Sequence, residues 1–354
     1  MPISAVDTIT LAFQHTKRQL LQPFRFWQWT RLALVGLLAG ETGSGGSFNF
    51  PTNIPHQTGG SSRQFVAQAF PKIDPAILGG LIAVLVIAGF VFFIVMLYVS
   101  SVMRFILFDS VLAKECHIRQ GWTRRQRPGW NYFLWQLGLM LATLAGVIVL
   151  LGIPAAFAFG MGWFNSPREH VLALVLSGIG VFFVMLLFFA TVAVVHVFTK
   201  DFVVPQMALE GVSAVEGWRR LWPLMQSEQS GYAAYVGMKI VLAIGAAIVI
   251  GIASLIILLV VAIPTAGVGI IAVLAGKTAG LTWNVFTITA AVVVGCIVLA
   301  AFFYLVSLIA VPAIVFFPAY AIYFFAARYR PLSLVLYPLP PSPTALGPAH
   351  EPAG

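Results

Sequence analysis

The sequence predicts an all-α, polytopic membrane protein, because it combines long apolar runs with very little charge. Of the 354 residues, 60% are hydrophobic and 9% are charged, whereas about a quarter of a soluble domain is charged. The apolar blocks lie at 26–40, 76–104, 132–160, 170–198, 232–263 and 286–325. Most exceed the roughly 20 residues that a membrane-crossing helix needs, and they are too continuous for barrel strands. We therefore expect about six spans.

The Lys and Arg residues outside these blocks alternate from one side of the membrane to the other. With Arg104, the last residue of its block, included, fourteen lie in the N-terminal segment, in two of the connections and at the start of the tail. The other three connections hold only Arg63, Lys72, Arg168 and Lys277. Because cytoplasmic loops carry the basic excess, the pattern predicts a prokaryotic cytoplasmic (inner) membrane protein with both termini in the cytoplasm. It also explains the net charge of +9 without nucleic acid, which we do not expect as a partner.

Two stretches depart from a simple six-span pattern. Residues 265–280 are apolar but short and rich in Gly and Ala, and we expect an external re-entrant or interfacial helix there. The last block contains Pro312 and Pro318, which predict a kinked helix that runs on past the membrane surface.

The Gly-rich stretch 40–47 lacks the Lys of a phosphate loop, and we interpret it as a flexible connector.

Two helix-capping patterns indicate an internal repeat. Ser4 begins Ser-Ala-Val-Asp and Ser213 begins Ser-Ala-Val-Glu, which ends at Glu216. A Ser followed three residues later by an acid is typical of a helix start. Apolar residues then recur at helical spacing, which predicts amphipathic helices on the cytoplasmic surface at 4–24 and 213–227.

The repeat extends to three units, of which the middle one matches least well. Trp122 follows a Gly, as Trp218 does, and Trp222 lies one turn further on. We expect these tryptophans at the membrane interface. A single membrane domain, 1–328, then divides into parallel units with two spans each, followed by a disordered Pro- and Ala-rich tail. The units are about 4–108, 109–200 and 201–328, and the tail is 329–354.

One stretch resembles a known motif. Between Phe202 and Arg219 a span ends in a Pro, the pair Glu210-Gly211 follows, and a Trp-Arg pair leads toward the next span. This is similar to the membrane domain attached to some glycerophosphoryl diester phosphodiesterases, and to related uncharacterised prokaryotic membrane families. The layout extends over about 76–325 and is specific around 202–240. The catalytic domain of that family has no counterpart here, so the resemblance implies a membrane domain without hydrolase activity.

Charged residues within or beside the apolar blocks form the candidate polar site. Arg31 and Lys239 lie inside blocks, where they either snorkel to the cytoplasmic surface or pair with an acid. Asp109 and Glu210 are the best placed partners for Lys239, and Asp201 is a third. A functional ion or head-group site is the alternative that an intramembrane charge also indicates.

No motif names a reaction, a cofactor or a metal. Cys116-His117 has no second ligand pair nearby, which a metal site would need. The leading interpretation is a non-enzymatic scaffold or accessory protein that organises lipid or a membrane-protein partner, with anionic lipid at the cytoplasmic face. The alternative is a small transporter or channel for an anionic solute, lined by Arg31 and Lys239. A membrane-embedded enzyme acting on lipid comes third.

Overall fold

The computed structural model describes residues 4–41, 75–163, 166, 168–278 and 285–337, and every regular element in these ranges is helical. The expected all-α class is therefore confirmed for them. The long helices are α4 (Pro75–Ala113), α5 (Ile118–Gly160), α6 (Val171–Phe198), α9 (Gln229–Thr278) and α10 (Val285–Ala326). The short ones are α1 (Asp7–Leu21), α2 (Phe26–Leu38), η1 (Thr199–Val203), α7 (Val204–Glu210), α8 (Ala214–Ser227) and α11 (Arg330–Leu336).

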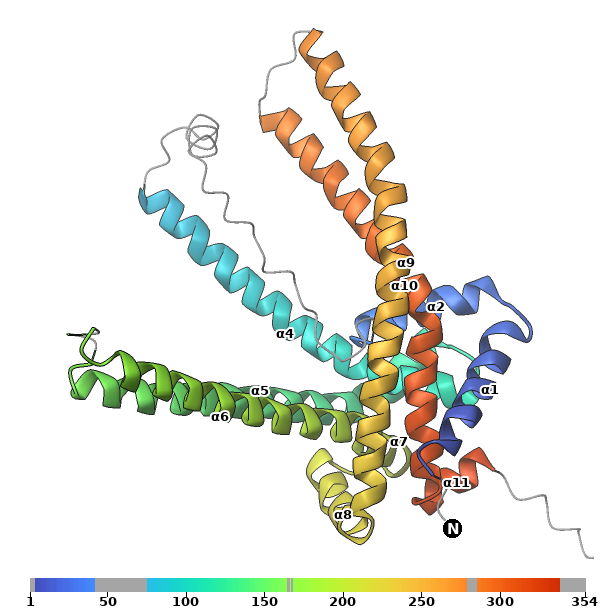
Figure 1. Ribbon diagram of the computed structural model, residues 1–354. Helices are drawn as coiled ribbons and strands as arrows, with labels where there is room; N and C mark the ends of the chain where they lie inside the picture. Colours follow the sequence, from blue (N-terminus) through green and yellow to red (C-terminus); the bar gives the residue numbers. More distant parts are fainter. Residues whose placement is uncertain (1–3, 42–74, 164–165, 167, 279–284, 338–354) are drawn as a thin grey trace, which may run out of the picture.

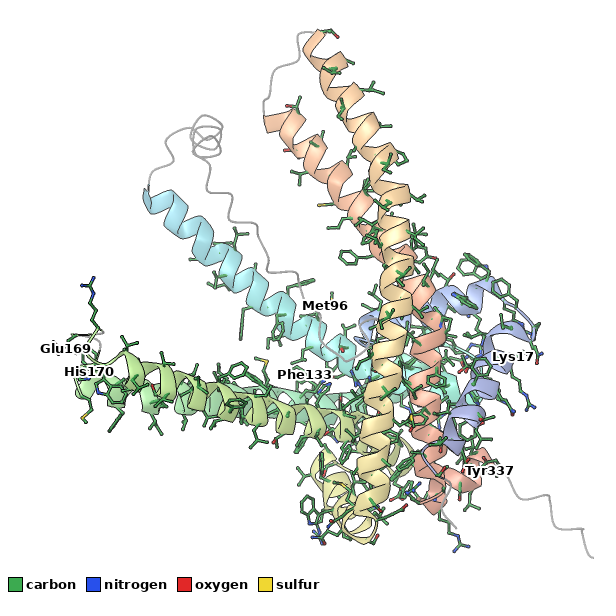
Figure 2. All side chains as sticks on the ribbon, viewed as in Figure 1. Lys17, Met96, Phe133, Glu169, His170 and Tyr337 are labelled. Carbon is green, nitrogen blue, oxygen red and sulfur yellow. The ribbon has the colours of Figure 1, made fainter. Side chains whose placement is uncertain are left out.

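Figure 1 shows three arms that diverge from one base. α4 forms one arm, α5 and α6 pack as a second, and α9 and α10 as a third. We use "base" for the short helices together with the ends of the long helices that meet them. Glu169 and His170 lie at the far end of the α5–α6 arm, whereas Lys17 and Tyr337 lie at the base (Figure 2).

Five described helices are long and apolar enough to cross a membrane, so the chain is a multi-pass membrane protein. They are Ala83–Ala113, Ile118–Gly160, Val171–Glu210, Gln229–Gly276 and Thr289–Ala326. Large apolar side chains are exposed all along the arms, as at Val86, Leu187 and Val260. A bilayer covers such surface with lipid tails, whereas a soluble monomer does not leave so much of it in water.

The six expected spans are not confirmed, because the first apolar block forms a helix too short to cross. α2 has 13 residues, about 20 Å of helix at 1.5 Å per residue, against a hydrocarbon core of about 30 Å. It packs in the base against α4 and α10. A Cβ on Gly36 would lie 2.5 Å from the Ile314 side chain, so this glycine allows the close approach. Any further crossing before Pro75 lies outside the described residues.

The expected re-entrant helix at 265–280 is also corrected. α9 runs without a break from Gln229 to Thr278, with Pro264 inside it. A proline removes one backbone hydrogen bond, and a long apolar helix can lose one and continue. Residues 265–278 therefore extend the third arm.

The start of the tail is ordered, contrary to the expectation for 329–354. α11 has Pro331 in its first turn, where the missing N–H has no helical partner to lose. The side chain of Leu332 is buried in the base. The remainder of the predicted tail, 338–354, lies outside the described residues.

α10 connects the third arm to the base. Figure 1 shows it changing direction between the two, and Pro312 and Pro318 lie inside it. In the base it meets α1, and the carbonyl of Ala5, two residues before α1, accepts a hydrogen bond of 3.2 Å from the Tyr320 hydroxyl. The Tyr320 ring stacks on that of Tyr235 from α9 at 5.1 Å. The base thus joins the first described helix of the chain to the last long one.

Candidate functional site

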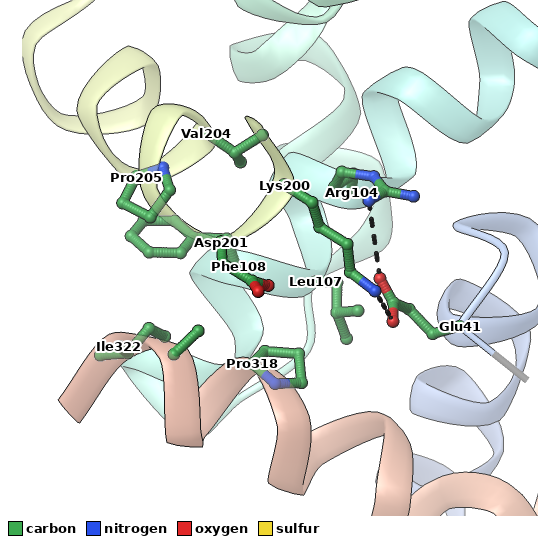
Figure 3. A pocket seen from close by; sticks show the side chains of 11 residues that line it. Glu41, Arg104, Leu107, Phe108, Lys200, Asp201, Val204, Pro205, Pro318 and Ile322 are labelled. Carbon is green, nitrogen blue, oxygen red and sulfur yellow. Dashed lines mark hydrogen bonds and ion pairs between the residues drawn. The ribbon is translucent and has the colours of Figure 1, made fainter. Parts of the chain in front are cut away.

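A buried ionic cluster lies where α2, α4 and η1 meet. Glu41, just beyond α2, forms an ion pair with Lys200 of η1, and its Oε1 lies 3.8 Å from Nη1 of Arg104 on α4 (Figure 3). The Glu41 and Arg104 side chains are 6% and 7% exposed. This corrects the interpretation of 40–47 as a connector only, because its second residue is buried and paired.

The next residue of η1 serves a second buried pair. Asp201 Oδ2 accepts a hydrogen bond of 2.9 Å from the Tyr235 hydroxyl and forms an ion pair with Lys239, both from α9. Asp201 is almost fully buried and Lys239 largely so. Two adjacent residues of η1, Lys200 and Asp201, therefore hold α2 and α9 to the end of the second arm.

The π-helical turn of η1 has a local cause in the sequence. Pro205 lies in the first turn of α7. It has no N–H, and in a regular α-helix its ring would clash with the carbonyl of Asp201. A single wide turn at Thr199–Val203 relieves this clash. Such π-bulges recur at functional sites.

The cluster holds more positive than negative formal charge. Among the described residues, the acids that pair with Arg104, Lys200 and Lys239 are Glu41 and Asp201. Burial raises the pKa of the Glu41 carboxyl, but Lys200 and Arg104 lower it by more, so that its pKa lies below the ordinary value. Glu41 is therefore a carboxylate at neutral pH, as the pairing requires.

Arg104 keeps unused hydrogen-bond donors in this buried setting. Its Nη2 donates to the Ala39 carbonyl over 2.8 Å. Within the described part of the chain, its Nε and Nη1 have no hydrogen-bond partner, and neither has the hydroxyl of buried Tyr132. The guanidinium carbon lies 5.6 Å from the centre of the Tyr132 ring. Unsatisfied buried donors are uncommon and call for a physical reason.

A small cavity of about 30 Å³ adjoins the cluster. Glu41, Arg104, Lys200 and Asp201 line it together with apolar side chains such as Leu107 (Figure 3). One water needs about 10–15 Å³ by this kind of measure. The cavity therefore has room for one small ion or two waters.

The partner of Lys239 differs from the two acids judged best placed in the sequence. Lys239 pairs with Asp201, whereas Asp109 accepts two hydrogen bonds from Arg125, at 2.7 and 2.6 Å. Glu210 bonds to Arg220 and to Tyr329. Asp109 and Glu210 sit near the ends of their helices. Lys239 lies near the end of the third turn of α9, about 15 Å along the helix, level with η1.

Arg31 does not join Lys239. Its side chain is exposed at the base, and its Nη1 lies 3.4 Å from the Cys116 carbonyl oxygen. The two cations that the transporter alternative places on one path therefore lie in different places.

The capping residues make their expected local bonds, with one difference. Ser213 Oγ accepts the Glu216 N–H at 3.3 Å, but the Glu216 carboxylate bonds to Arg220 at 3.0 Å. Ser4 Oγ accepts the Asp7 N–H at 3.1 Å. Glu216, the acid of the later copy, therefore pairs with a side chain one turn further along α8.

The three expected interfacial tryptophans have different roles. Trp218 Nε1 donates to Thr199 Oγ1 over 2.9 Å, which ties α8 to η1. Trp122 packs edge to face on Tyr98, with ring centres 6.2 Å apart. Trp222 is exposed. Of these three, only Trp222 projects freely from the base.

A larger and open pocket, of about 570 Å³, lies between α4, α5 and α11. Asp109, His117, Arg124 and Arg125 are among its lining residues. The pocket has the size of a small-molecule or head-group site. It places basic and acidic side chains on the surface of the base.

Sequence reasoning missed Glu41, Arg104 and Lys200 as members of one cluster. Arg104 interrupts the apolar run 102–108, and Lys200 precedes an acid between two further apolar runs. A charge flanked by apolar residues on both sides indicates a buried partner. That signal marks Arg104 and Lys200, whereas nothing in the Gly-rich surroundings of Glu41 marks it.

Five long apolar helices on an ionic and aromatic base define a multi-pass helical membrane protein. More particularly, the chain belongs to a family of unknown function (DUF7544), whose profile matches residues 3–335. No curated protein and no solved structure matches it. Because the family match extends from α1 into α11, the base and the arms together form the unit that the family shares.

Proposed function

We propose that this protein is a scaffold of the prokaryotic cytoplasmic membrane, which gathers anionic lipid around its base. The segregation of charge carries the proposal. Of the Lys and Arg residues that the structure describes, only Arg168 and Lys277 lie at the far ends of the arms. The arms are apolar and suit the hydrocarbon core, whereas the base is basic and suits a negatively charged leaflet.

Exposed aromatic side chains on the base support the same assignment. On α8, Arg219 is 82% exposed and Trp222 is 55% exposed. Near the start of α2, Trp27 is 75% exposed and follows Phe24 and Arg25, which are also exposed. Aromatic and basic side chains together bind the head-group region of a bilayer, the aromatics by burial and the cations by charge. In this proposal α8 and the α1–α2 corner lie on the membrane surface.

The orientation follows from the same asymmetry. Basic segments stay in the cytoplasm, so the base is the cytoplasmic end. Both ends of the described chain, Ser4 and Tyr337, belong to the base. The proposal therefore keeps both termini in the cytoplasm, although α2 does not cross, because Glu41 lies in the base and α4 begins at the far end of its arm.

A threefold repeat accounts for how the base is built. In each proposed unit, the helix that returns to the base packs on the first helix of the next unit. Gly121 of α5 lies against Ile106 of α4, and Trp218 of α8 donates a hydrogen bond to Thr199 at the end of the second unit. α10 packs in turn on α1, which closes the series. We infer that the three units form a ring at the cytoplasmic surface.

The transporter alternative has less support than the scaffold. It needs Arg31 and Lys239 on one path, but Arg31 is exposed and Lys239 is paired within the cluster. The proposed likeness to phosphodiesterase membrane domains is compatible with a scaffold, since those domains accompany a separate catalytic domain.

Reconstitution into nanodiscs of mixed phosphatidylcholine and phosphatidylglycerol tests the scaffold proposal. Native mass spectrometry should find phosphatidylglycerol enriched among the lipids that stay bound. A variant with Lys17→Gln, Arg18→Gln and Arg219→Gln should lose most of that enrichment, because its base carries less charge.

The matched control is Arg168→Gln, which removes a cation from the end of an arm. It should retain the full enrichment. Equal lipid composition in the wild type and in the bulk nanodisc would contradict the proposal. Equal loss in the control and the base variant would show that the position of the charge has no role.

A further inference from the structure

We propose that the buried ionic cluster binds one small monovalent anion of chloride size, in the cavity beside Arg104 and Lys200. This inference is independent of lipid binding by the exposed base. It rests on the charge of the cluster, on unused donors and on the size of the cavity.

The charge of the cluster calls for one more anion. Two carboxylates face three cations, all largely buried. An unbalanced charge in a low-dielectric setting is unfavourable unless a partner compensates it. A monovalent anion makes the cluster neutral, whereas a monovalent cation would double its excess of positive charge.

The available hydrogen bonds also favour an anion. Glu41 already faces Lys200 and Arg104, and Asp201 already has Lys239 and a tyrosine hydroxyl. The unsatisfied groups are donors, because Nε and Nη1 of Arg104 lack a hydrogen-bond partner among the described residues. Arg104 is only 6% exposed, and it lines the cavity. A spherical anion accepts from several such N–H groups at once.

The size of the cavity selects the class of anion. A volume of about 30 Å³ holds one or two water-sized bodies. A halide fits this space, whereas phosphate or sulfate, with five heavy atoms, would have to extend out of its open side. The site therefore takes a halide, and chloride is the halide that cells supply.

An anion here would strengthen the joint of the base. Arg104, Lys200 and Glu41 come from three segments far apart in the chain, α4, η1 and the end of α2. A ligand that binds only the folded protein stabilises it in proportion to the logarithm of its concentration above Kd. We expect the unfolding midpoint to rise with chloride concentration.

The test is thermal unfolding of the purified full-length protein in detergent, with sodium gluconate replaced stepwise by sodium chloride at constant ionic strength. The midpoint should rise with chloride and with bromide. Arg104→Gln should abolish this dependence, because it removes the excess charge and the unused donors. Arg31→Gln, which removes an exposed arginine of the same base, should retain it.

An unfolding midpoint that does not respond to chloride would overturn the proposal. The excess charge of the cluster would then be neutralised in another way, for example by release of a proton from Lys200. A response that survives Arg104→Gln would also overturn it, since the anion would then bind elsewhere. Should that variant fail to fold, crystals of the wild type grown in sodium bromide decide the matter. An anomalous bromide peak within hydrogen-bond distance of Arg104 supports the site, and its absence refutes it.

Discussion

Asp201 of η1 and Lys239 of α9 form a buried ion pair that joins the second arm to the third. The pair also receives a hydrogen bond from Tyr235, one turn before Lys239. The Asp201 side chain is 3% exposed and that of Lys239 is 14% exposed, so bulk water is a poor substitute partner for either charge. The contact therefore has direct consequences for stability.

Lys239→Met should lower the free energy of unfolding by about 3–5 kcal/mol, because it leaves the Asp201 carboxylate buried without its cation. Combining it with Asp201→Asn should restore much of the loss. A double-mutant cycle measured by equilibrium unfolding in mixed micelles gives the coupling. Coupling of Lys239→Met with Glu210→Gln instead of Asp201→Asn would contradict the pairing.

Arg125→Ala should cost about 2 kcal/mol, since it removes two hydrogen bonds to Asp109 and one of 2.7 Å to the Ala208 carbonyl. Arg125→Lys should not recover the loss, because an ammonium cannot form the two-bonded pair. The neighbouring exposed Arg124 is the control, and Arg124→Ala should change the unfolding free energy by less than about 0.5 kcal/mol. Similar losses at both positions would mean that net charge, and not geometry, is responsible.

His15 should make stability depend on pH. Its ring nitrogens lie 3.1 Å from the Tyr323 hydroxyl and 2.9 Å from the Val111 carbonyl oxygen. Burial lowers the pKa of this imidazole below its ordinary 6.5, so the folded protein holds it neutral while the unfolded chain protonates it first. Stability is then fully present above about pH 6.5 and falls as the pH drops below that value toward the lowered pKa.

Unfolding free energies measured between pH 7.5 and pH 5 test this linkage. His15→Gln should flatten the curve in that window, whereas His117→Gln, at an exposed position, should leave its shape unchanged. A curve of equal slope in His15→Gln and the wild type would assign the pH dependence to other groups.

Reporter fusions should establish the topology. Fusions after Arg328 and within 113–127 should report cytoplasm, because these positions lie in the base. A fusion at Glu169, at the far end of the α5–α6 arm, should report the outside. An external C-terminus would reverse the assignment of the base to the cytoplasmic side.

Much of the architecture follows from local sequence patterns. Runs such as 171–198 are apolar on every face, so they predict long helices without any knowledge of their neighbours. Ser213 predicts the start of α8, because a cap bonds to an N–H three residues away. The sequence did not decide the structure where an apolar run is short, because such a run is compatible with two structures. Residues 26–38 suit both a short span and a buried helix, and packing against α4 and α10 decides for the second.

The sequence by itself determined that this is a helical membrane protein with its basic residues gathered at one end, because length, hydropathy and charge are additive along a chain. Only the tertiary structure decided which charges meet. Glu41 and Arg104 are 63 positions apart and Asp201 and Lys239 are 38 apart, so their pairing depends on how the ends of four helical segments converge in the base. Distance along the chain carries no information about that convergence, which the packing of η1 against α10 and its ion pair with α9 create.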